Sequence, residues 1–404
     1  MDQGNAKKPN PGFTNQTRSD AISVAVPSLA RANGLLMWVC GLFLSVGLTA
    51  CSSVNTIHPP IMADEPLPIG TPESVGLDAA RLDNVSNQLA AMQSHQLHSM
   101  LVLRSGRLVF EEYYNGYSRD NPHDLRSATK SITSLLTGAA LDQGVIASVE
   151  SPIMDFLAKS YPNVDNKDDI QTRHLLTMSS GLDCDDFNWR SKGQEDRLYR
   201  TQDWVASFLA LPPVHAPGEV ARYCTAGVIA LGEVIAQASG RDFSDFADDA
   251  LFGPMGINNY RWARFDNDEK VDTGGHLLLT PQGMAKLGLL VLQEGQWEGR
   301  QLISRDWIQE SIQPQTQVRE TPYGYLWWID TLSYGEKRVK VIWASGNGGQ
   351  LIFIVPEYDL VAVFTAGFYN SDKTAVLFDI FYRSILPSVI ELQSHLREMS
   401  SREG

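Results

Sequence analysis

The stretch LRSATKSITSLL, residues 125–136, places a serine and a lysine three residues apart at the start of an apolar segment. A serine hydroxyl is a weak nucleophile until a base removes its proton. Side chains three residues apart on a helix share one face, so the amine of Lys130 can reach the Ser127 oxygen. Unpaired N–H groups in the first turn of such a helix would also attract an oxyanion. The spacing therefore predicts acyl transfer, with Ser127 as the nucleophile.

The same letters have a second interpretation, which is an ordinary serine at the start of a helix. Serine and lysine are common, so a chain this long contains Ser-x-x-Lys about once or twice by chance. The context favours catalysis, because the pair begins a helix of small residues directly after an extended hairpin.

The elements that would position this pair follow from the pattern of apolar residues. Two β-branched, apolar runs flank the turn-prone residues 104–106 and predict a hairpin over 99–117. Residues 127–141 repeat apolar positions at helical spacing, and Gly144 is placed to end this helix. Further strands are expected near the C-terminus, followed by an amphipathic helix, at 323–329, 340–346, 350–356, 360–367 and 374–392.

Strands near both ends of the chain with helices between them predict an α+β fold. The expected architecture is one antiparallel sheet built from N- and C-terminal strands and flanked by helices. The middle of the chain, about 152–295, reads mostly as helix and loop, including a helix over 227–240, and predicts an insertion lobe. We expect the folded domain to span 71–395, followed by a short tail at 396–404.

The N-terminal segment 1–51 is typical of a secretory signal, because basic residues precede an uninterrupted apolar run and small residues end it. Its ending, Leu48-Thr49-Ala50-Cys51, resembles the lipobox of bacterial lipoproteins, in which the cysteine is lipidated. This resemblance implies an exported protein on the periplasmic side, anchored by lipid on Cys51, with the outer membrane favoured. An uncleaved membrane anchor is the alternative. The proline-rich residues 52–70 predict a tether.

Charge and cysteine content narrow the class of protein further. The formal net charge of −14 argues against nucleic-acid binding, which normally needs a basic face. No zinc-type cysteine spacing is present, and the proposed chemistry needs neither a metal nor an organic cofactor. Beyond the signal segment only Cys184 and Cys224 remain. They can form a disulfide in an oxidising periplasm, or stay as two separate thiols.

Several stretches together carry a family resemblance. The SATK tetrad resembles the first motif of the serine β-lactamase and penicillin-binding-protein superfamily. The segments HLLTMSSGLDCDD, PGEVARYCTAGVIALGEVIAQASG and GNGGQLIFIVPEYDLVAVFTAG are similar, in order and separation, to those of its class C-related branch. That branch also holds esterases, D-aminopeptidases and 6-aminohexanoate-dimer hydrolases. The resemblance spans roughly 67–387 and implies their fold.

The resemblance implies roles for further residues. Tyr223 takes the place of the second-motif tyrosine and would pass protons between Ser127, Lys130 and the leaving group. Thr225 stands where the family usually has asparagine; it can donate a hydrogen bond or cap the next helix. At the third motif, residues 346–350 are Gly-Asn-Gly-Gly-Gln and contain no lysine.

This third motif bears on the oxyanion hole and on the substrate. We expect the Asn347 backbone N–H to join that of Ser127 at the oxyanion, with Gly348 and Gly349 allowing the substrate to approach closely. A missing cation forfeits roughly 1.5–3 kcal/mol of carboxylate binding, which disfavours penicillins. The pocket would instead be neutral or aromatic. Candidate pocket and lid residues, each with a core or solvated alternative, are Tyr325, Trp327, Trp328, Trp343, Asp185, Asp186 and Trp189.

The leading interpretation is a serine hydrolase that cleaves a small-molecule or peptide ester or amide through an acyl-enzyme on Ser127. One alternative is a β-lactamase or D,D-peptidase acting on penicillins or peptidoglycan peptides. The other is a catalytically inactive binding lipoprotein on the same fold, which the altered second and third motifs motivate.

Overall fold

The computed structural model describes residues 63–91, 95–334 and 337–390. The chain divides into two units, 1–57 and 58–404, and every described residue belongs to the second. The predicted signal segment with its lipobox, the first part of the tether and the C-terminal tail lie outside the described residues. Within the described part, no helix is long and apolar enough to cross a membrane, and no cluster of three or more His, Cys, Asp or Glu is placed to hold a metal.

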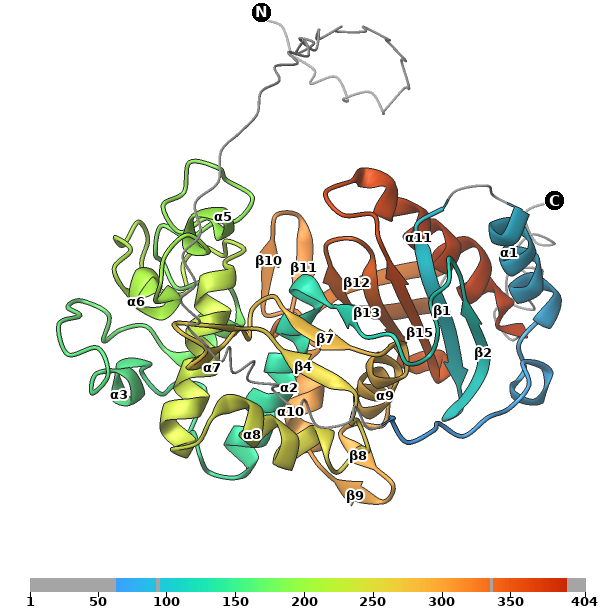
Figure 1. The fold of residues 1–404 in the computed structure, drawn as a ribbon, viewed down its shortest axis with the longest axis horizontal. Coiled ribbons are helices and arrows are strands. Elements are labelled where there is room, and N and C mark those ends of the chain that lie inside the picture. Colours follow the sequence, from blue (N-terminus) through green and yellow to red (C-terminus); the bar gives the residue numbers. More distant parts are fainter. Residues whose placement is uncertain (1–62, 92–94, 335–336, 391–404) are drawn as a thin grey trace, which may run out of the picture. The chain divides into compact units, whose positions relative to one another are not determined.

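The centre of the domain is an eight-stranded antiparallel sheet in the order β10-β11-β12-β13-β14-β15-β1-β2 (Figure 1). The N-terminal strand β1 pairs directly with the last C-terminal strand, β15, with Leu101 opposite Val363, and β2 pairs with the other edge of β1. The predicted sheet from both ends of the chain is therefore confirmed. The strands are β1 (Leu97–Arg104), β2 (Arg107–Tyr113), β10 (Thr316–Val318), β11 (Thr321–Tyr323), β12 (Trp328–Tyr334), β13 (Lys337–Gly346), β14 (Gln350–Val355) and β15 (Leu360–Ala366).

Both faces of this sheet are covered, so β1 is buried along its whole length. Alternate side chains enter two separate apolar cores, with Leu101 in one and Met100 in the other. Helix α9 (Pro281–Leu292) packs on the first face. Helices α1 (Ala79–Ala91) and α11 (Ala375–Ile380) cover the second (Figure 1).

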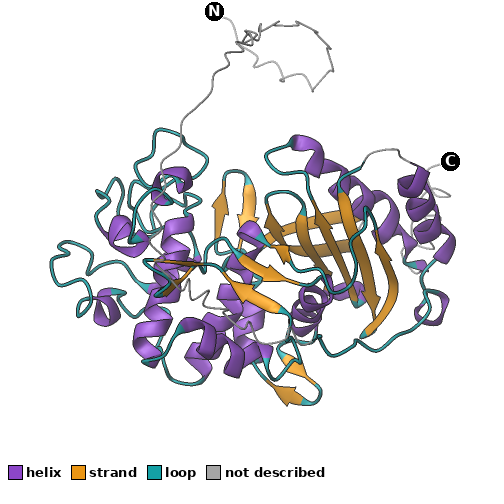
Figure 2. Ribbon diagram, viewed as in Figure 1, coloured by secondary structure: helices purple, strands orange, loops and turns teal. Residues whose placement is uncertain are grey.

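A helix-rich lobe lies beside the sheet (Figure 2). Its centre is α7, which packs against α2, and Gly240 ends α7 in the left-handed conformation at φ +66°. The remaining helices are α2 (Thr129–Asp142), α3 (Met154–Leu157), α4 (Thr172–Leu176), α5 (Glu195–Leu198), α6 (Trp204–Leu209), α7 (Thr225–Ser239), α8 (Phe243–Ala247) and α10 (Arg305–Ser311).

Short strands and short 3-10 or π-helical turns complete the domain. A three-stranded sheet in the order β3-β7-β4 leads into the serine motif, and two two-stranded ribbons lie elsewhere. The strands are β3 (His123–Asp124), β4 (Tyr260–Trp262), β5 (Arg264–Phe265), β6 (Lys270–Val271), β7 (Leu277–Leu279), β8 (Gln296–Trp297) and β9 (Arg300–Gln301). The turns are η1 (Glu73–Val75), η2 (Arg126–Ala128), η3 (Asp248–Phe252), η4 (Pro356–Tyr358), η5 (Asp372–Thr374), η6 (Phe381–Ile385) and η7 (Leu386–Ser388).

Two predictions about the ends of the domain are wrong. The tether does not extend to residue 70, because Leu67 is buried and Gly70 donates its N–H to the Leu108 carbonyl at 3.0 Å. The domain therefore begins before residue 71. The final helix is not continuous either. Its first turns are α11, after which the backbone passes through a π-helical turn, η6, and a 3-10 turn with Pro387 inside it.

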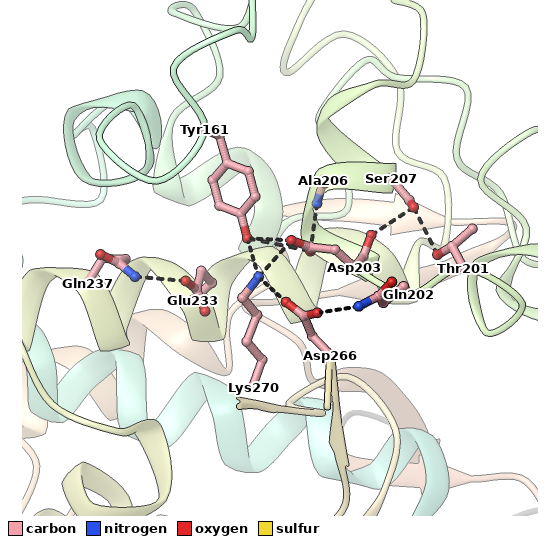
Figure 3. Close-up of polar contacts among 10 residues, drawn as sticks. All are labelled: Tyr161, Thr201, Gln202, Asp203, Ala206, Ser207, Glu233, Gln237, Asp266 and Lys270. Atoms are coloured by element: carbon pink, nitrogen blue, oxygen red, sulfur yellow. Dashed lines mark hydrogen bonds and ion pairs between the residues drawn. The ribbon is translucent and has the colours of Figure 1, made fainter. Parts of the chain in front are cut away.

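A polar cluster away from Ser127 ties the helical lobe together (Figure 3). The Lys270 amine lies 2.7 Å from Asp203 Oδ2, 3.0 Å from Asp266 Oδ2 and 2.9 Å from the Tyr161 hydroxyl. Burial opposes the charge of Lys270, but these hydrogen bonds raise its pKa overall. Asp203 also accepts the N–H of Ala206 at the start of α6. The cluster thus joins β6 to the N-terminus of α6.

Replacing Lys270 with methionine is expected to destabilise the domain by about 2–3 kcal/mol, because two part-buried carboxylates lose their cation. Chemical unfolding would measure this loss, and the exposed Lys373→Met would serve as control. The two variants unfolding at the same midpoint would contradict a structural role for Lys270.

Candidate active site

Ser127 sits in a tight turn, η2, which hydrogen bonds to strand β7 hold in place. The Leu125 N–H donates to the Leu277 carbonyl of β7 at 2.9 Å, and the Leu277 N–H donates to Thr129 Oγ1 at 3.2 Å. Arg126 adopts φ +49°, an uncommon value for a side-chain-bearing residue. The predicted helix thus begins at Thr129, two residues later than expected, and Ser127 stands just before it.

Lys130 is buried, with 1% of its surface exposed, and its amine has three acceptors. It lies 3.1 Å from Ser127 Oγ, 2.9 Å from Thr225 Oγ1 and 2.6 Å from the Gly274 carbonyl oxygen. An ammonium group has three protons, so these contacts satisfy it completely. The structure therefore brings together the serine and the lysine that the motif predicted, at hydrogen-bonding distance.

Tyr223 lies against the same amine. Lys130 Nζ is 5.0 Å from the centre of the Tyr223 ring. Burial raises the pKa of the Tyr223 phenol, and the Lys130 charge and a hydrogen bond with Ser127 only partly offset this. The phenol is therefore a proton donor at neutral pH. Its ring stacks on those of Phe187 and Trp328, at centroid distances of 5.2 and 5.7 Å.

Thr225 links the lysine to a carboxylate. Its hydroxyl accepts from Lys130 and donates to Asp186 Oδ2 at 2.8 Å, and its N–H donates to the same oxygen at 2.7 Å. Burial raises the pKa of Asp186 to about 6, against the opposing effects of Lys130 and Thr225. The helix-capping role considered for Thr225 falls to Cys224, whose Sγ accepts the Gly227 N–H at 3.2 Å.

A glycine turn supplies the third acceptor for Lys130. Gly274 donates its N–H to Asp272 Oδ1 at 3.0 Å, and Asp272 is fully buried. Burial raises the pKa of Asp272 to about 6. His276, two residues after Gly274, has its Nδ1 atom 2.8 Å from Asp124 Oδ2. The sequence did not indicate this segment, because a backbone carbonyl that accepts a hydrogen bond leaves no side-chain pattern.

The third motif packs directly on the turn that carries Ser127. A Cβ atom at Gly346 would overlap the Leu125 carbonyl oxygen, so only glycine allows β13 to approach this closely. Within the described residues, neither the Ser127 N–H nor the Asn347 N–H has a hydrogen-bond acceptor. The Asn347 side chain is turned away into a pair of hydrogen bonds with Asn370, at 2.7 and 2.8 Å.

Gly346→Ala is expected to lower kcat/KM by about 100-fold, because the added methyl group separates β13 from the Ser127 turn. Gly299→Ala is the control at a remote turn: a Cβ at that glycine meets nothing within 4 Å, so the substitution strains the local turn at φ +79° without separating β13 from Ser127. Steady-state kinetics on an ester substrate would measure the difference. Equal rates for the two variants would contradict the argument.

The other two glycines of the third motif also have little space around them. Gly348 and Gly349 adopt φ +95° and +98°, which side-chain-bearing residues rarely tolerate. A Cβ at Gly348 would meet the Tyr369 ring. Their positive φ angles therefore favour glycine at both positions, independently of the substrate.

The prediction that Tyr325, Trp327 and Trp328 share one strand is wrong. Residues 324–327 form the turn between β11 and β12, where Leu326 has φ +64°. Trp327 is fully buried in the core, and the Tyr325 hydroxyl donates to Glu310 at 2.8 Å. Trp328 alone of these three stacks on Tyr223.

Trp343 contacts the ring of Trp328, and among the described residues no ring contact joins Trp343 to Tyr223. It is opposite Trp328 in the sheet, with ring centroids 6.3 Å apart. It belongs to the apolar core on the face of the sheet that α1 and α11 cover. Trp343 therefore packs against Trp328 as its neighbour on the adjacent strand.

One aromatic residue of the acidic loop after Cys184 contacts Tyr223. Phe187 is 52% exposed, stacks on Tyr223, and lies 4.7 Å from the Arg319 guanidinium. Trp189, a predicted lid residue, is 72% exposed and contacts Arg190 instead. Asp185 accepts the Phe187 N–H at 3.0 Å and so shapes the loop.

The structure contains a disulfide between Cys184 and Cys224, with Cα atoms 5.4 Å apart. Cys224 stands between Tyr223 and Thr225, and Cys184 stands two residues before Asp186. The disulfide therefore joins the loop that bears Asp186 to the segment that bears Tyr223 and Thr225.

Comparisons with known proteins agree with this geometry. The family described as Beta-lactamase matches residues 84–378, well over half of the chain. A 6-aminohexanoate-dimer hydrolase of Paenarthrobacter ureafaciens is 23% identical over 322 residues, which covers 70% of this chain and 76% of that protein.

Two solved structures share the fold. A Bacillus anthracis protein with the provisional name 6-aminohexanoate-dimer hydrolase superposes with a TM-score of 0.65 at 16% identity, over 82% of this chain and 89% of that one. A penicillin binding protein from Bacillus halodurans gives a TM-score of 0.58 at 18% identity, over 74% of this chain and 100% of that one. The fold and family expected from the motifs are confirmed. The chain therefore belongs to the Beta-lactamase family and is a serine hydrolase of the β-lactamase and penicillin-binding-protein superfamily.

Proposed function

We propose that this hydrolase cleaves an ester or amide bond through an acyl-enzyme on Ser127. The observation that carries the proposal is the buried Lys130 amine, 3.1 Å from Ser127 Oγ and held by two further acceptors. A lysine with two of its positions fixed by Thr225 and Gly274 can direct its third position only at the serine. This is the arrangement of a nucleophile with its base.

The proposed steps balance every proton. Neutral Lys130 takes the hydroxyl proton as Ser127 Oγ attacks the carbonyl carbon, and the Ser127 and Asn347 N–H groups bind the oxyanion. Tyr223 then gives its phenol proton to the leaving group, and the Lys130 ammonium restores it. A water molecule attacks the acyl-enzyme by the same route in reverse, releasing the acid and Ser127.

The surroundings of the site favour an uncharged segment of substrate beside the third motif. No lysine stands there, and the Asn347 side chain is already paired with Asn370. Aromatic rings of Phe187 and Trp328 flank Tyr223. The relative named as a 6-aminohexanoate-dimer hydrolase supports a linear amide as the substrate class. A β-lactam or D-Ala-D-Ala peptide, which needs a grip on its carboxylate, fits less well.

We further propose that the enzyme works outside the cytoplasmic membrane, anchored by lipid on Cys51. The disulfide between Cys184 and Cys224 supports export, because structural disulfides form in oxidising compartments. The apolar run before Cys51 supports a cleaved signal.

The test is to treat the full chain with a fluorophosphonate probe and locate the adduct by peptide mass mapping. The proposal expects an adduct on Ser127, together with hydrolysis of a p-nitrophenyl ester or of the linear dimer of 6-aminohexanoate. Well-folded protein without adduct or turnover would refute it. Efficient nitrocefin hydrolysis with no turnover of linear substrates would move the enzyme to the β-lactamases.

A further inference from the structure

We propose that Asp186, held in place by the Cys184–Cys224 disulfide, is a positioning residue that fixes Thr225 as an acceptor for Lys130 and so keeps the lysine aimed at Ser127. The inference rests on the proposed acyl-enzyme mechanism and deepens it. It predicts that hydrolysis requires both the Asp186 carboxylate and the oxidised state of the two cysteines.

Both carboxylate oxygens of Asp186 face hydrogen-bond donors. Oδ2 accepts the N–H and the hydroxyl of Thr225, at 2.7 and 2.8 Å. Oδ1 accepts the Glu195 N–H at 3.0 Å. An amide in this place would turn its NH2 group against a donor in either orientation. Only an ionised carboxylate satisfies all three donors at once.

The Thr225 hydroxyl has a single proton to donate. Because Asp186 takes that proton, the oxygen can meet Lys130 only with a lone pair. The Gly274 carbonyl is a second fixed acceptor. When Lys130 is neutral, its two remaining protons go to these acceptors, and its lone pair is left pointing at Ser127. Without Asp186 the Thr225 hydroxyl is free to donate to that lone pair and block the base.

The two cysteines of the disulfide lie close in sequence to Asp186 and Thr225. Cys184 precedes Asp186 by two residues, and Cys224 adjoins Thr225, so the bond spans the two segments that the carboxylate must bridge. The Asp186 N–H also donates to the Tyr223 carbonyl at 2.8 Å. One covalent bond and three hydrogen bonds thus hold a single pair of segments in register. Reduction removes the only covalent member of this set.

Other charged groups face the same amine and enter any pH profile. Glu195 raises the pKa of Asp186 by its charge, in addition to the larger effect of burial, while Lys130 lowers it. Asp272, on the other side of Lys130, has its pKa raised to about 6 as well. Tyr223 stays protonated throughout the neutral range. We therefore expect the ionisations of Asp186 and Asp272 to contribute to the acid limb of the rate.

Asp186→Asn is expected to lower kcat by about 10- to 100-fold with little change in KM, because the base is misdirected while the substrate contacts remain. The acid limb of its pH profile should also become shallower, since one of the two carboxyl groups no longer titrates. Loss of structure alone would lower the rate without changing the shape of the profile. Asp183→Asn, on the other side of Cys184, is the matched control and should keep the wild-type rate.

Thr225 offers a conservative rescue. Thr225→Ser keeps the hydroxyl between Asp186 and Lys130 and should stay within a few-fold of the wild-type kcat. Thr225→Val removes it and should fall as far as Asp186→Asn. Wild-type rates in both Asp186→Asn and Thr225→Val would overturn the proposal.

The disulfide is tested by reducing the wild-type full chain with dithiothreitol. The reagent gives two electrons and two protons to the S–S bond and ends as its cyclic disulfide. We expect kcat to fall together with the rate of Ser127 labelling, and to return on reoxidation. Alkylation of two thiols with an unchanged kcat would show that the disulfide plays no part in positioning.

The outcomes separate this inference from the proposed function. No labelling of oxidised wild-type protein at Ser127 would refute the mechanism itself. Labelling and turnover in wild type, unaffected by Asp186→Asn, would refute only the positioning role. Should the reduced protein unfold, the Asp186 and Thr225 variants decide the question, because they leave the disulfide intact.

Discussion

Ser127→Ala should lower the turnover of any ester or amide substrate by at least about 10³-fold, the scale of loss when a nucleophile is removed from a concerted catalytic group. In the proposed mechanism the Ser127 oxygen forms the covalent intermediate. The residual rate would come from the oxyanion donors and from substrate binding alone. Steady-state kinetics with a chromogenic ester would measure the loss.

The same substitution should leave folding almost unchanged. Ser127 is part-exposed, and its hydroxyl accepts one hydrogen bond from Lys130, worth about 1 kcal/mol. Circular dichroism and thermal unfolding would verify that the variant is folded. Ser131→Ala, on the next turn, is the specificity control for fluorophosphonate labelling. A folded Ser127→Ala protein that keeps its turnover would end the acyl-enzyme mechanism.

Lys130→Met should cost nearly as much activity, about 10²- to 10⁴-fold, because it removes the base and keeps an unbranched side chain of similar length. The Ser127 hydroxyl then has no group to take its proton. We expect slow or absent labelling at Ser127 and a kcat that does not recover at high pH. Thr225 keeps its two bonds to Asp186, so the fold is retained.

A second buried lysine makes this comparison decisive. Lys286 is also 1% exposed, and its amine donates to the carbonyls of Met255 and Gly256, both at 2.8 Å. Lys286→Met should therefore lower the melting temperature, since two buried carbonyls lose their donor, without changing the rate per folded molecule. An equal loss of kcat in both lysine variants would mean that Lys130 acts through stability and not as a base.

The sequence predicted the elements whose signals are local. The Ser-x-x-Lys spacing fits one helical turn, and the structure puts Lys130 beside Ser127. The hairpin around Arg104-Ser105-Gly106 is formed by β1 and β2, because β-branched runs on both sides of a turn rarely have another use. Gly240 ends α7 for a reason that is local too.

Features that depend on tertiary contacts escaped sequence reasoning. Asp186 looked like part of a solvated loop, and only the fold brings its carboxylate onto Thr225. Asp272 and Gly274 act on Lys130 through a backbone carbonyl, which no side-chain pattern records. The aromatic run at 323–329 has strong strand propensity, but Leu326 takes a left-handed turn there. Tertiary packing overrode local preference at that point.

The pairing of β1 with β15 sets the order in which the chain can fold. Ser99 and Thr365 share a hydrogen bond across 266 residues of sequence. During synthesis, β1 and β2 emerge early but have no neighbour on the inner side until nearly the whole chain has left the ribosome. Contacts so distant in sequence form slowly, because loop closure costs entropy before pairing stabilises the sheet.

A nascent chain of this kind stays unfolded for as long as its C-terminal strands are missing. Under the proposed export, that delay would keep the polypeptide unfolded while it passes through a membrane channel. It also leaves the apolar β1 edge unpaired, a segment prone to aggregation. A truncation that removes β15 therefore deletes a central strand, and we expect it to abolish the fold, whereas loss of the outermost strand β10 would be far milder.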